Sequence, residues 1–400
     1  MPLLHPLRFV PLSLAGALAV LLAACGGGGG PAEGTGTLRL ALTDAPACGY
    51  ETVFVTVERV RVHRSATAAD ADGGWQEVVV NPPRRIDLLS LTNGALAPLG
   101  QAQLPAGTYT QLRLVLAPNT TANPLANAIK PVNAPEQALT TPSATESGLK
   151  LNVNLEVPAD RVADFAIDFD ACKSFVKAGN SGKILMKPVL AVIPILSDAG
   201  QSIQGWLAPS LVSAGATVSA QQGGRVVRAT PPMSDGQFAL YPVPAGSYDL
   251  VITAPGRATA TLTGVPVQTT AITTVGSSTA RLDTPASATQ QRLGGVVSLN
   301  ASSTNIGASV RALQSYASGP TVEVSSTNPL DVTGSYALDL PLAAPVRLPY
   351  VPQSTSFIWQ PDAAAAGRYR IEARVQSIAT PKATEVTLGA TPATVDFAFP

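Results

Sequence analysis

Four aspartates are the residues whose type and spacing come closest to a metal site. Three alternate with apolar residues in the segment 164–170, and the fourth follows the alternating segment 38–42: the candidates are Asp44, Asp164, Asp168 and Asp170. Side chains two residues apart on a strand share a face at a spacing of ~7 Å, and Ca²⁺ prefers several carboxylate and carbonyl oxygens. The spacing therefore allows a calcium site. Because the chain has no acidic loop of regular Asp spacing, we favour turn capping or pairing with Lys150, Lys173 and Lys187.

Hydrolytic chemistry finds little support in the residues. A Ser-His-Asp triad would have to use His63, which is the only histidine besides His5. His63 lies on the polar face of an alternating segment, and the chain has no Gly-x-Ser-x-Gly elbow. Nothing in the sequence brings two carboxylates together in a cleft as a glycosidase requires. We therefore predict no catalytic residue and no enzyme activity, with a secreted hydrolase as an alternative.

Aromatic and basic residues offer a second kind of site. A platform for sugar stacking would draw on Trp75, Trp206, Trp359, Tyr241 and Tyr248. Each tryptophan sits in a strand-like apolar pattern, so core packing is the favoured interpretation. A basic cluster is formed by Arg59, Arg61, His63 and Arg64. A solvated strand face explains this cluster best, and contact with envelope polysaccharide or lipid headgroups is the alternative.

Composition bounds the class of protein. The chain has 26 basic and 26 acidic residues, so no basic field is available to recruit nucleic acid. Only 13% of residues are charged, while 34 Gly and 35 Pro accompany frequent Val, Thr, Ala and Ser. This mixture favours short strands and turns over helices. A length of 400 residues predicts two or three domains.

Period-2 alternation predicts the elements that would position these residues. Apolar residues alternate with polar ones in 38–42, 53–63, 112–116, 150–157 and 164–170, and the segment 75–80 follows a polar turn as the return strand of a hairpin. The segment 118–147 is expected to hold loops and one short pair of strands. The run 184–195 is almost continuously apolar and is predicted as the last strand of the first domain.

The N-terminal segment predicts export. An uncharged apolar run follows Arg8 and ends in Leu22-Ala23-Ala24-Cys25, the layout of a secretory signal. A cysteine directly after Leu-Ala-Ala resembles the lipobox of bacterial lipoproteins. The resemblance implies removal of 1–24, acylation of Cys25 as a membrane anchor and, with Gly26 following, sorting to the outer membrane. Residues 25–36 are then a lipidated, glycine-rich tether.

Two cysteines remain once Cys25 is assigned to lipid. Cys48 and Cys172 are an even pair in an oxidising compartment, which favours a disulfide. On the chain-entropy model, a loop of this length stabilises the fold by up to ~4.7 kcal/mol. Two buried free thiols or a metal pair are the alternatives, although His63 alone cannot complete a zinc site.

Several phrases in order resemble a known family over residues 36–196. They are Leu42-Thr43-Asp44-Ala45-Pro46, Leu104-Pro105-Ala106-Gly107-Thr108-Tyr109, Ser147-Gly148-Leu149-Lys150, Asp168-Phe169-Asp170-Ala171-Cys172-Lys173-Ser174 and Leu185-Met186-Lys187-Pro188-Val189. They are similar to a bacterial lipoprotein family catalogued as domain of unknown function 4382. The resemblance implies an exported antiparallel β-sandwich, residues 37–196, without an established activity.

Two further modules are expected. Phrases such as Ile203-Gln204-Gly205-Trp206 and Val243-Pro244-Ala245-Gly246-Ser247-Tyr248 resemble the carboxypeptidase regulatory-like, transthyretin-like sandwich over 201–283. A divergent copy is expected over 292–400, with a proline-rich insertion from Pro341 to Pro361. Short linkers would make the modules flexible beads on a string.

These observations combine into one expectation. The fold class is all-β, a string of antiparallel β-sandwich domains after a lipoprotein signal peptide. The protein is expected to be a non-catalytic binding or structural module of the cell envelope, anchored in the membrane by lipid, with an envelope protein or polysaccharide as partner. A calcium-dependent adhesion or carbohydrate-binding protein is the other alternative. No cofactor is expected besides calcium in that alternative.

Overall fold

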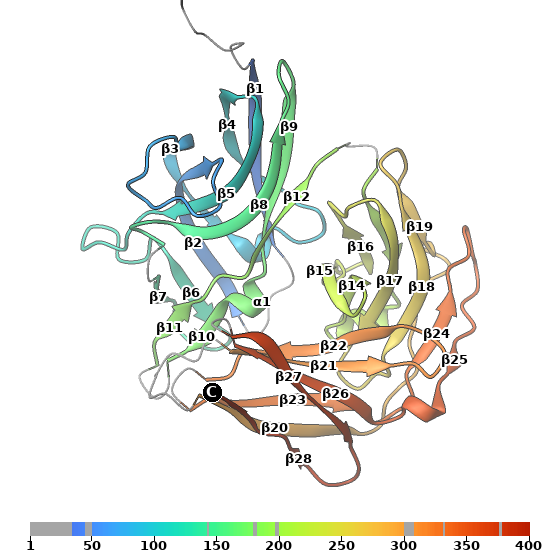
Figure 1. Ribbon diagram of the computed structural model, residues 1–400. Helices are drawn as coiled ribbons and strands as arrows, with labels where there is room; N and C mark the ends of the chain where they lie inside the picture. The colour runs from blue at the N-terminus through green and yellow to red at the C-terminus, as the bar shows by residue number, and fades with distance from the viewer. Residues whose placement is uncertain are drawn as a thin grey trace, which may run out of the picture. The chain divides into compact units, whose positions relative to one another are not determined.

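Segments that alternate between apolar and polar residues form strands wherever one face can be buried. The computed structural model describes residues 34–44, 50–141, 144–178, 182–196, 200–299, 308–330, 333–375 and 378–400. Nearly all of the regular structure is strand, and the sheets surround three main apolar cores (Figure 1). The all-β prediction is confirmed.

The first sandwich, within residues 34–196, packs a four-stranded sheet against a larger one. The smaller sheet has the order β12 (Leu190–Pro194), β9 (Val162–Phe169), β1 (Thr35–Asp44), β4 (Ala97–Pro105). The larger sheet has the order β10 (Phe175–Lys177), β11 (Ile184–Met186), β7 (Gln137–Thr140), β6 (Ala128–Pro131), β2 (Tyr50–His63), β5 (Gly107–Leu116), β8 (Leu149–Val157), and β3 (Gln76–Asp87) also pairs with β2. The short helices are η1 (Leu88–Ser90) and α1 (Ala171–Ser174).

A β-bulge explains why the apolar positions of β2 change phase. The valines of 53–57 occupy odd positions, whereas Val60 and Val62 occupy even ones, and all of them are buried. The register of β2 with β3 and β5 shifts between Val57 and Arg59. A bulge places two residues of one strand opposite one residue of its partner, so both halves of β2 keep their valines in the core.

A hydrogen-bonded tyrosine closes the repeated turn. The hydroxyls of Tyr109 and Tyr248 each donate at 2.8 Å to the carbonyl of the proline four residues earlier. In the third sandwich Tyr369 instead donates to the Pro341 carbonyl at 2.5 Å, from a different strand. The ring packs in the core while its hydroxyl satisfies a turn carbonyl. In the first two sandwiches the turn is therefore stabilised by its tyrosine as well as by glycine.

The second and third sandwiches follow the same two-sheet plan. The smaller sheet of the second sandwich has the order β16 (Gln237–Leu240), β13 (Ile203–Trp206), β19 (Thr273–Val275). Its larger sheet has the order β15 (Arg225–Thr230), β14 (Thr217–Gln222), β17 (Gly246–Thr253), β18 (Ala260–Val267), β24 (Val346–Pro349), β25 (Gln360–Pro361). The short helix α2 (Pro209–Ser213) also belongs to this sandwich. The third has β23 (Ser335–Pro341) and β28 (Ala393–Thr394) or β29 (Phe397–Phe399) beside β20 (Gln290–Leu299), and the sheet β22 (Thr321–Thr327), β21 (Ala308–Ser315), β26 (Arg368–Val375), β27 (Ile378–Thr387), with η3 (Ala363–Ala365).

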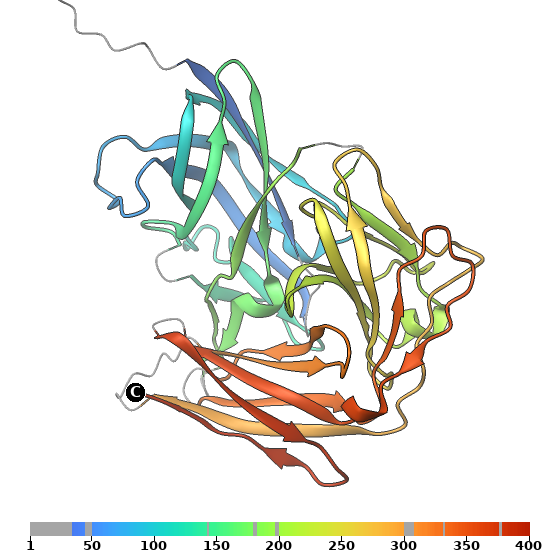
Figure 2. The ribbon, with the colours of Figure 1, turned by 45° about the vertical axis from the view of Figure 1, so that its right-hand side comes forward.

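The proline-rich segment expected as an insertion of the third sandwich contributes strands to the second. Strand β24 pairs in parallel with β18, with Ala260 opposite Val346 and Leu262 opposite Leu348. Val346 is buried in the second core, and β25 continues the sheet beyond β24 (Figure 2). The edge of β18 is therefore covered by chain that follows four strands of the third sandwich.

Three other expectations require correction. The sheets are mixed rather than purely antiparallel, because β1 pairs in parallel with β9, β13 with β19 and β20 with β28. The run 184–195 is two strands, since β11 and β12 join different sheets on either side of Pro188. The modules are not separate beads, because Gly34–Pro400 forms one compact unit.

Several predicted features lie outside the described residues. These are the signal segment, Cys25 with most of its tether, and Cys48. Strand β1 begins at Thr35, so the last residues assigned to the tether are already in a sheet. Cys172 lies in α1, although its side chain is not described. Among the residues that are described, no helix has the length and apolar character needed to cross a membrane.

Candidate functional site

A buried arginine of the second sandwich is bound by the first. Arg228, on β15, is 2% exposed and forms an ion pair with the Asp168 carboxylate. Its other terminal nitrogen donates to the hydroxyl of Thr43. The parallel register of β1 and β9 sets Thr43 directly opposite Asp168, so the two acceptors stand side by side. The β15–β14 register shifts beside Arg228, and such bulges re-aim side chains.

Asp44 adds a second buried carboxyl to this contact. It ends β1, is fully buried, and its Oδ1 accepts a hydrogen bond from the Ala171 amide at 2.9 Å. Its Oδ2 is buried without a hydrogen-bond partner. Burial raises the pKa of Asp44 well above its usual value, and the neighbouring carboxylates of Asp168 and Asp170 raise it further. Burial also raises the pKa of Asp168, although the Arg228 guanidinium opposes the rise.

Asp170 and Lys173 extend the contact to the third sandwich. Asp170 caps α1, accepting a hydrogen bond from the Lys173 amide at 3.1 Å. The Lys173 ammonium lies 3.2 Å from Asp170 Oδ2 and 3.4 Å from Glu323 Oε1 of β22. Burial disfavours the charged form of Lys173, but the Asp170 and Glu323 carboxylates outweigh that effect and raise its pKa.

Glu323 joins all three sandwiches. Its backbone exchanges two hydrogen bonds with the Gln221 side chain of β14, at 2.7 and 2.8 Å. Its carboxylate, besides facing Lys173, lies 3.3 Å from Arg311 of β21, which also donates to the Gly224 carbonyl at 2.8 Å. Glu323 is only 7% exposed, so these charges interact in a poorly solvated setting. We call the following set the junction network: Thr43, Asp44, Asp168, Asp170, Lys173, Gln221, Arg228, Arg311 and Glu323.

The four aspartates proposed for calcium therefore lie next to basic side chains, and three of them also lie next to one another. Asp44, Asp168 and Asp170 come together in the junction network, next to Arg228 and Lys173. Asp164 instead pairs with Arg39, its neighbour in the register of β1 and β9. In the described part of the chain, no group of three or more His, Cys, Asp or Glu is placed to hold a metal ion. Of the three lysines expected as partners, Lys173 pairs with Asp170, whereas Asp168 and Asp164 pair with arginines.

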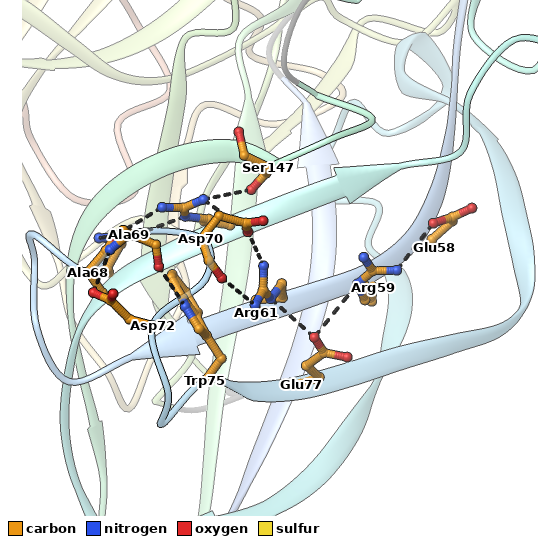
Figure 3. A network of polar contacts seen from close by, with 12 residues as sticks. Glu58, Arg59, Arg61, Ala68, Ala69, Asp70, Asp72, Trp75, Glu77 and Ser147 are labelled. Atoms are coloured by element: carbon orange, nitrogen blue, oxygen red, sulfur yellow. Dashed lines mark hydrogen bonds and ion pairs between the residues drawn. The ribbon is translucent and has the colours of Figure 1, made fainter.

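Arg61 of the basic cluster and Arg113 of β5 pack against the half-buried ring of Trp75 (Figure 3). Arg61 forms an ion pair with Asp70, and its guanidinium carbon lies 4.6 Å from the Trp75 ring centroid. Arg113 lies 4.8 Å from the same centroid and also reaches Asp70, at 3.3 Å. The Trp75 indole N–H donates to the Ala69 carbonyl at 3.0 Å. These contacts hold the loop between β2 and β3 and occupy the ring that a sugar platform would need.

His63 has backbone partners. Its Nε2 lies 3.0 Å from the Gly73 carbonyl, and its Nδ1 accepts a hydrogen bond from the Ser65 amide at 2.9 Å. A catalytic base needs a nucleophile's hydroxyl or thiol within reach. The positions of these partners give His63 a role in closing the loop.

The tryptophans agree with the core-packing interpretation only in part. Trp75, Trp206 and Trp359 are each half-buried. Trp359 packs against the second core, and its indole donates to the Asp283 carbonyl at 2.6 Å. Of the two tyrosines in that set, Tyr248 is a core residue and Tyr241 is half-buried.

Sequence reasoning missed the residues on which the junction network depends. Arg228, Gln221 and Glu323 were not among the candidates. One signal was available: Arg228 interrupts the run Val226-Val227-Arg228-Ala229, where a charged residue follows an apolar pair within a predicted β-rich module. A buried charge requires a partner, but the partner lies in another module.

Comparisons with known proteins agree with the resemblance of the first sandwich. Residues 35–188 match the model of the family described as "Domain of unknown function (DUF4382)". No curated protein matches the chain. The lipoprotein assignment and the transthyretin-like character of the other modules stay predictions.

Solved structures give only distant similarities. The chain is 9% identical to the Bacillus anthracis TIE protein, with a TM-score of 0.18, covering 92% of this chain and about half (50%) of that one. The major pilin SpaA of Corynebacterium diphtheriae is 11% identical, with a TM-score of 0.18 and coverage of 91% and 99%. A cohesin–dockerin complex from Acetivibrio cellulolyticus is 21% identical over 26% of this chain and 78% of that one, with a TM-score of 0.20. Similarity at this level carries no argument about function.

Replacing the buried arginine tests the ion pair. We expect Arg228→Met to lower the free energy of unfolding by about 3–5 kcal/mol, because Asp168 is left buried without its counter-charge. Urea unfolding at pH 7 measures the loss. Arg225→Met on the same strand is the matched control, since Arg225 is exposed, and its effect should stay within about 0.5 kcal/mol. The double variant Arg228→Met/Asp168→Leu should recover most of the loss. Equal effects of the two single variants would contradict the assignment.

Asp44 should give the fold a measurable pH dependence. Its pKa is higher in the folded chain than in the unfolded chain, where it is about 3.9. The stability that it contributes is therefore fully present below about pH 4 and is lost as the pH rises through the folded pKa. The Asp44→Asn variant cannot titrate, so it should gain stability relative to the wild type between pH 4.5 and pH 7.5, by about 1.4 kcal/mol for each unit of pKa shift traversed. Urea unfolding at both pH values measures this difference, and parallel pH profiles would refute it.

Proposed function

We propose that this protein is a lipid-anchored, non-catalytic structural module of the cell envelope, whose three sandwiches act as one stiff unit. The observation that carries the proposal is the junction network, in which Glu323 contacts Lys173, Gln221 and Arg311, one from each sandwich. Separating buried, mutually paired charges is strongly destabilising, because each charge is left buried without its partner. A stiff unit of this kind suits a structural protein that keeps the outer face of its sandwiches at a fixed distance from the lipid anchor.

The chemistry of the polar residues supports a non-catalytic role. Asp164, Asp168 and Asp170 face cations, and His63 faces backbone groups. Catalytic acids and bases need to face a substrate cleft with a suitable pKa. Asp44 has a shifted pKa, but it lies fully buried beneath the junction and not in a cleft.

The anchor and its location form part of the same proposal. Cys25 follows the lipobox-like Leu22-Ala23-Ala24, and Gly26 after it suggests the outer membrane. The short tether would keep the first sandwich close to the bilayer surface, since β1 begins at Thr35 and a linker of about nine residues has a reach of about 15–18 Å. Envelope proteins or polysaccharides are then the available partners.

A disulfide between Cys48 and Cys172 would strengthen the first sandwich. The residues that flank the two cysteines are in contact. Asp44 accepts a hydrogen bond from Ala171, and the rings of Tyr50 and Phe175 meet edge to face with centroids 6.0 Å apart. Contacts between the flanking residues support this proposed pairing.

Calorimetry of the purified chain tests the stiff unit. The wild type is expected to unfold in one cooperative transition, because breaking any sandwich leaves buried charges of the others unpaired. Glu323→Ala should split this transition and lower the stability of the junction by about 2 kcal/mol, the value of a charged hydrogen bond. The matched control is Glu385→Ala, an exposed glutamate of β27 in the same sandwich. Separate transitions in the wild type would overturn the proposal, as would an unsplit transition in Glu323→Ala.

Intact mass of the membrane-extracted protein tests the anchor and the disulfide together. We expect a chain that begins at acylated Cys25, with Cys48 and Cys172 resistant to thiol labelling until they are reduced. Cys25→Ser should move the protein from the membrane fraction to the soluble fraction. An unprocessed chain with freely labelled thiols would contradict the envelope location and the disulfide at once.

A further inference from the structure

A groove of about 600 Å³ lies on the second sandwich, between β19 and the segment that follows β24. One wall is formed by Pro266 and the segment 271–277, which includes β19, and the other by Tyr350 and the segment 352–355 that follows β24. Neither the calcium candidates nor the junction network contributes to it. The groove is large enough for a small ligand of a few rings.

The lining of the groove is uncharged. Every side chain that faces it is aliphatic, aromatic, hydroxyl or amide, and the polar ones include Gln268, Thr274, Ser277 and Gln353. Hydroxyl and amide groups both donate and accept hydrogen bonds, as sugar hydroxyls do. A phosphate, carboxylate or ammonium group would find no counter-charge among these lining residues.

Tyr350 supplies an aromatic surface on a rigid support. Its backbone amide donates to the Thr263 carbonyl at 2.9 Å, extending the β18–β24 pairing by one residue. The ring packs partly against the second core and stays half-buried. Its hydroxyl donates to the Thr274 carbonyl at 3.4 Å, so the two walls of the groove meet at this point. A ring held in this way stacks on a ligand without losing freedom of its own.

Gln353 is held in a strained conformation at the same place. Its φ angle is +56°, a left-handed conformation that glycine adopts at little cost and glutamine does not. Strain of this kind gathers at ligand-binding positions. Gln353 is exposed, so its amide is available to a ligand.

From these observations we propose that the groove beside Tyr350 binds a neutral oligosaccharide, with Tyr350 as the stacking surface and Gln353 as a hydrogen-bonding amide. An extended peptide fits less well. The open edge of β19 would have to pair with it, yet the Thr274 carbonyl on that strand already faces the Tyr350 hydroxyl. This inference goes beyond the structural role proposed above and does not depend on the anchor or the junction network.

Affinity electrophoresis of the purified chain tests the proposal. Native gels contain one soluble neutral polysaccharide each, namely galactomannan, β-glucan or arabinan, and a parallel gel contains the acidic polymer polygalacturonate. We expect retardation by at least one neutral polymer and none by polygalacturonate. Tyr350→Ala should weaken the retarding interaction about threefold to tenfold through loss of the stacking surface. No retardation in any neutral gel, or retardation by polygalacturonate alone, would overturn the proposal.

A glycine substitution separates binding from folding. Gln353→Gly removes the amide and relieves the left-handed backbone, so it should weaken binding while leaving the melting temperature unchanged or raised. Asn133→Gly is the matched control, since Asn133 is also exposed, has a φ of +59° and lies in the first sandwich. Its affinity should equal that of the wild type. Full affinity in both Tyr350→Ala and Gln353→Gly would exclude this groove. Calorimetric cooperativity should be the same in all these variants, so failure here is distinct from failure of the stiff unit.

Discussion

The charge of Arg228 constrains how the first two sandwiches meet. A guanidinium that is almost removed from water is tolerable only beside its counter-charge, because the loss of hydration exceeds what weak or distant contacts return. Asp168 and Thr43 can meet it together only because β1 and β9 run in parallel with those two residues opposite each other. The parallel pairing of β1 with β9 therefore also sets the contact between the first and second sandwiches.

The rest of the junction network follows the same logic. Burying Lys173 without a counter-charge would be costly, but it forms ion pairs with Asp170, which caps α1, and with Glu323. Glu323 in turn is balanced by Arg311 and held in place by Gln221. Arg228 and Lys173 therefore each depend on a carboxylate from another module, and these ion pairs couple the sandwiches. The small apolar contact of Val251, Tyr316 and Val322 adds to this coupling.

Local pattern and long-range pairing differ in how well they could be predicted. Alternation in 38–42 and 53–63 predicted β1 and β2, since burial of one face is a local property of the chain. The register shift between Val57 and Arg59 corresponds to a change in the sequence from valines at odd positions to valines at even positions. Pairing of β24 with β18 and of Arg228 with Asp168 was not predictable, because each depends on a partner far away in the sequence. Three of the four aspartates lie together as the sequence predicts, and Lys173 is an expected partner that pairs with Asp170. The partners Arg228 and Arg39 were not predicted.

The long separation in sequence between β18 and β24 affects folding during synthesis. Strand β18 pairs with β17 on one side and with β24 on the other. It ends at Val267, but β24 begins only at Val346, after β20 to β23 have been synthesised. The second sheet therefore stays incomplete while the ribosome produces most of the next module, and its open edge is exposed during that interval. In evolution the last two modules have to be inherited together. A gene boundary between them would remove β24 from the sheet of the second sandwich.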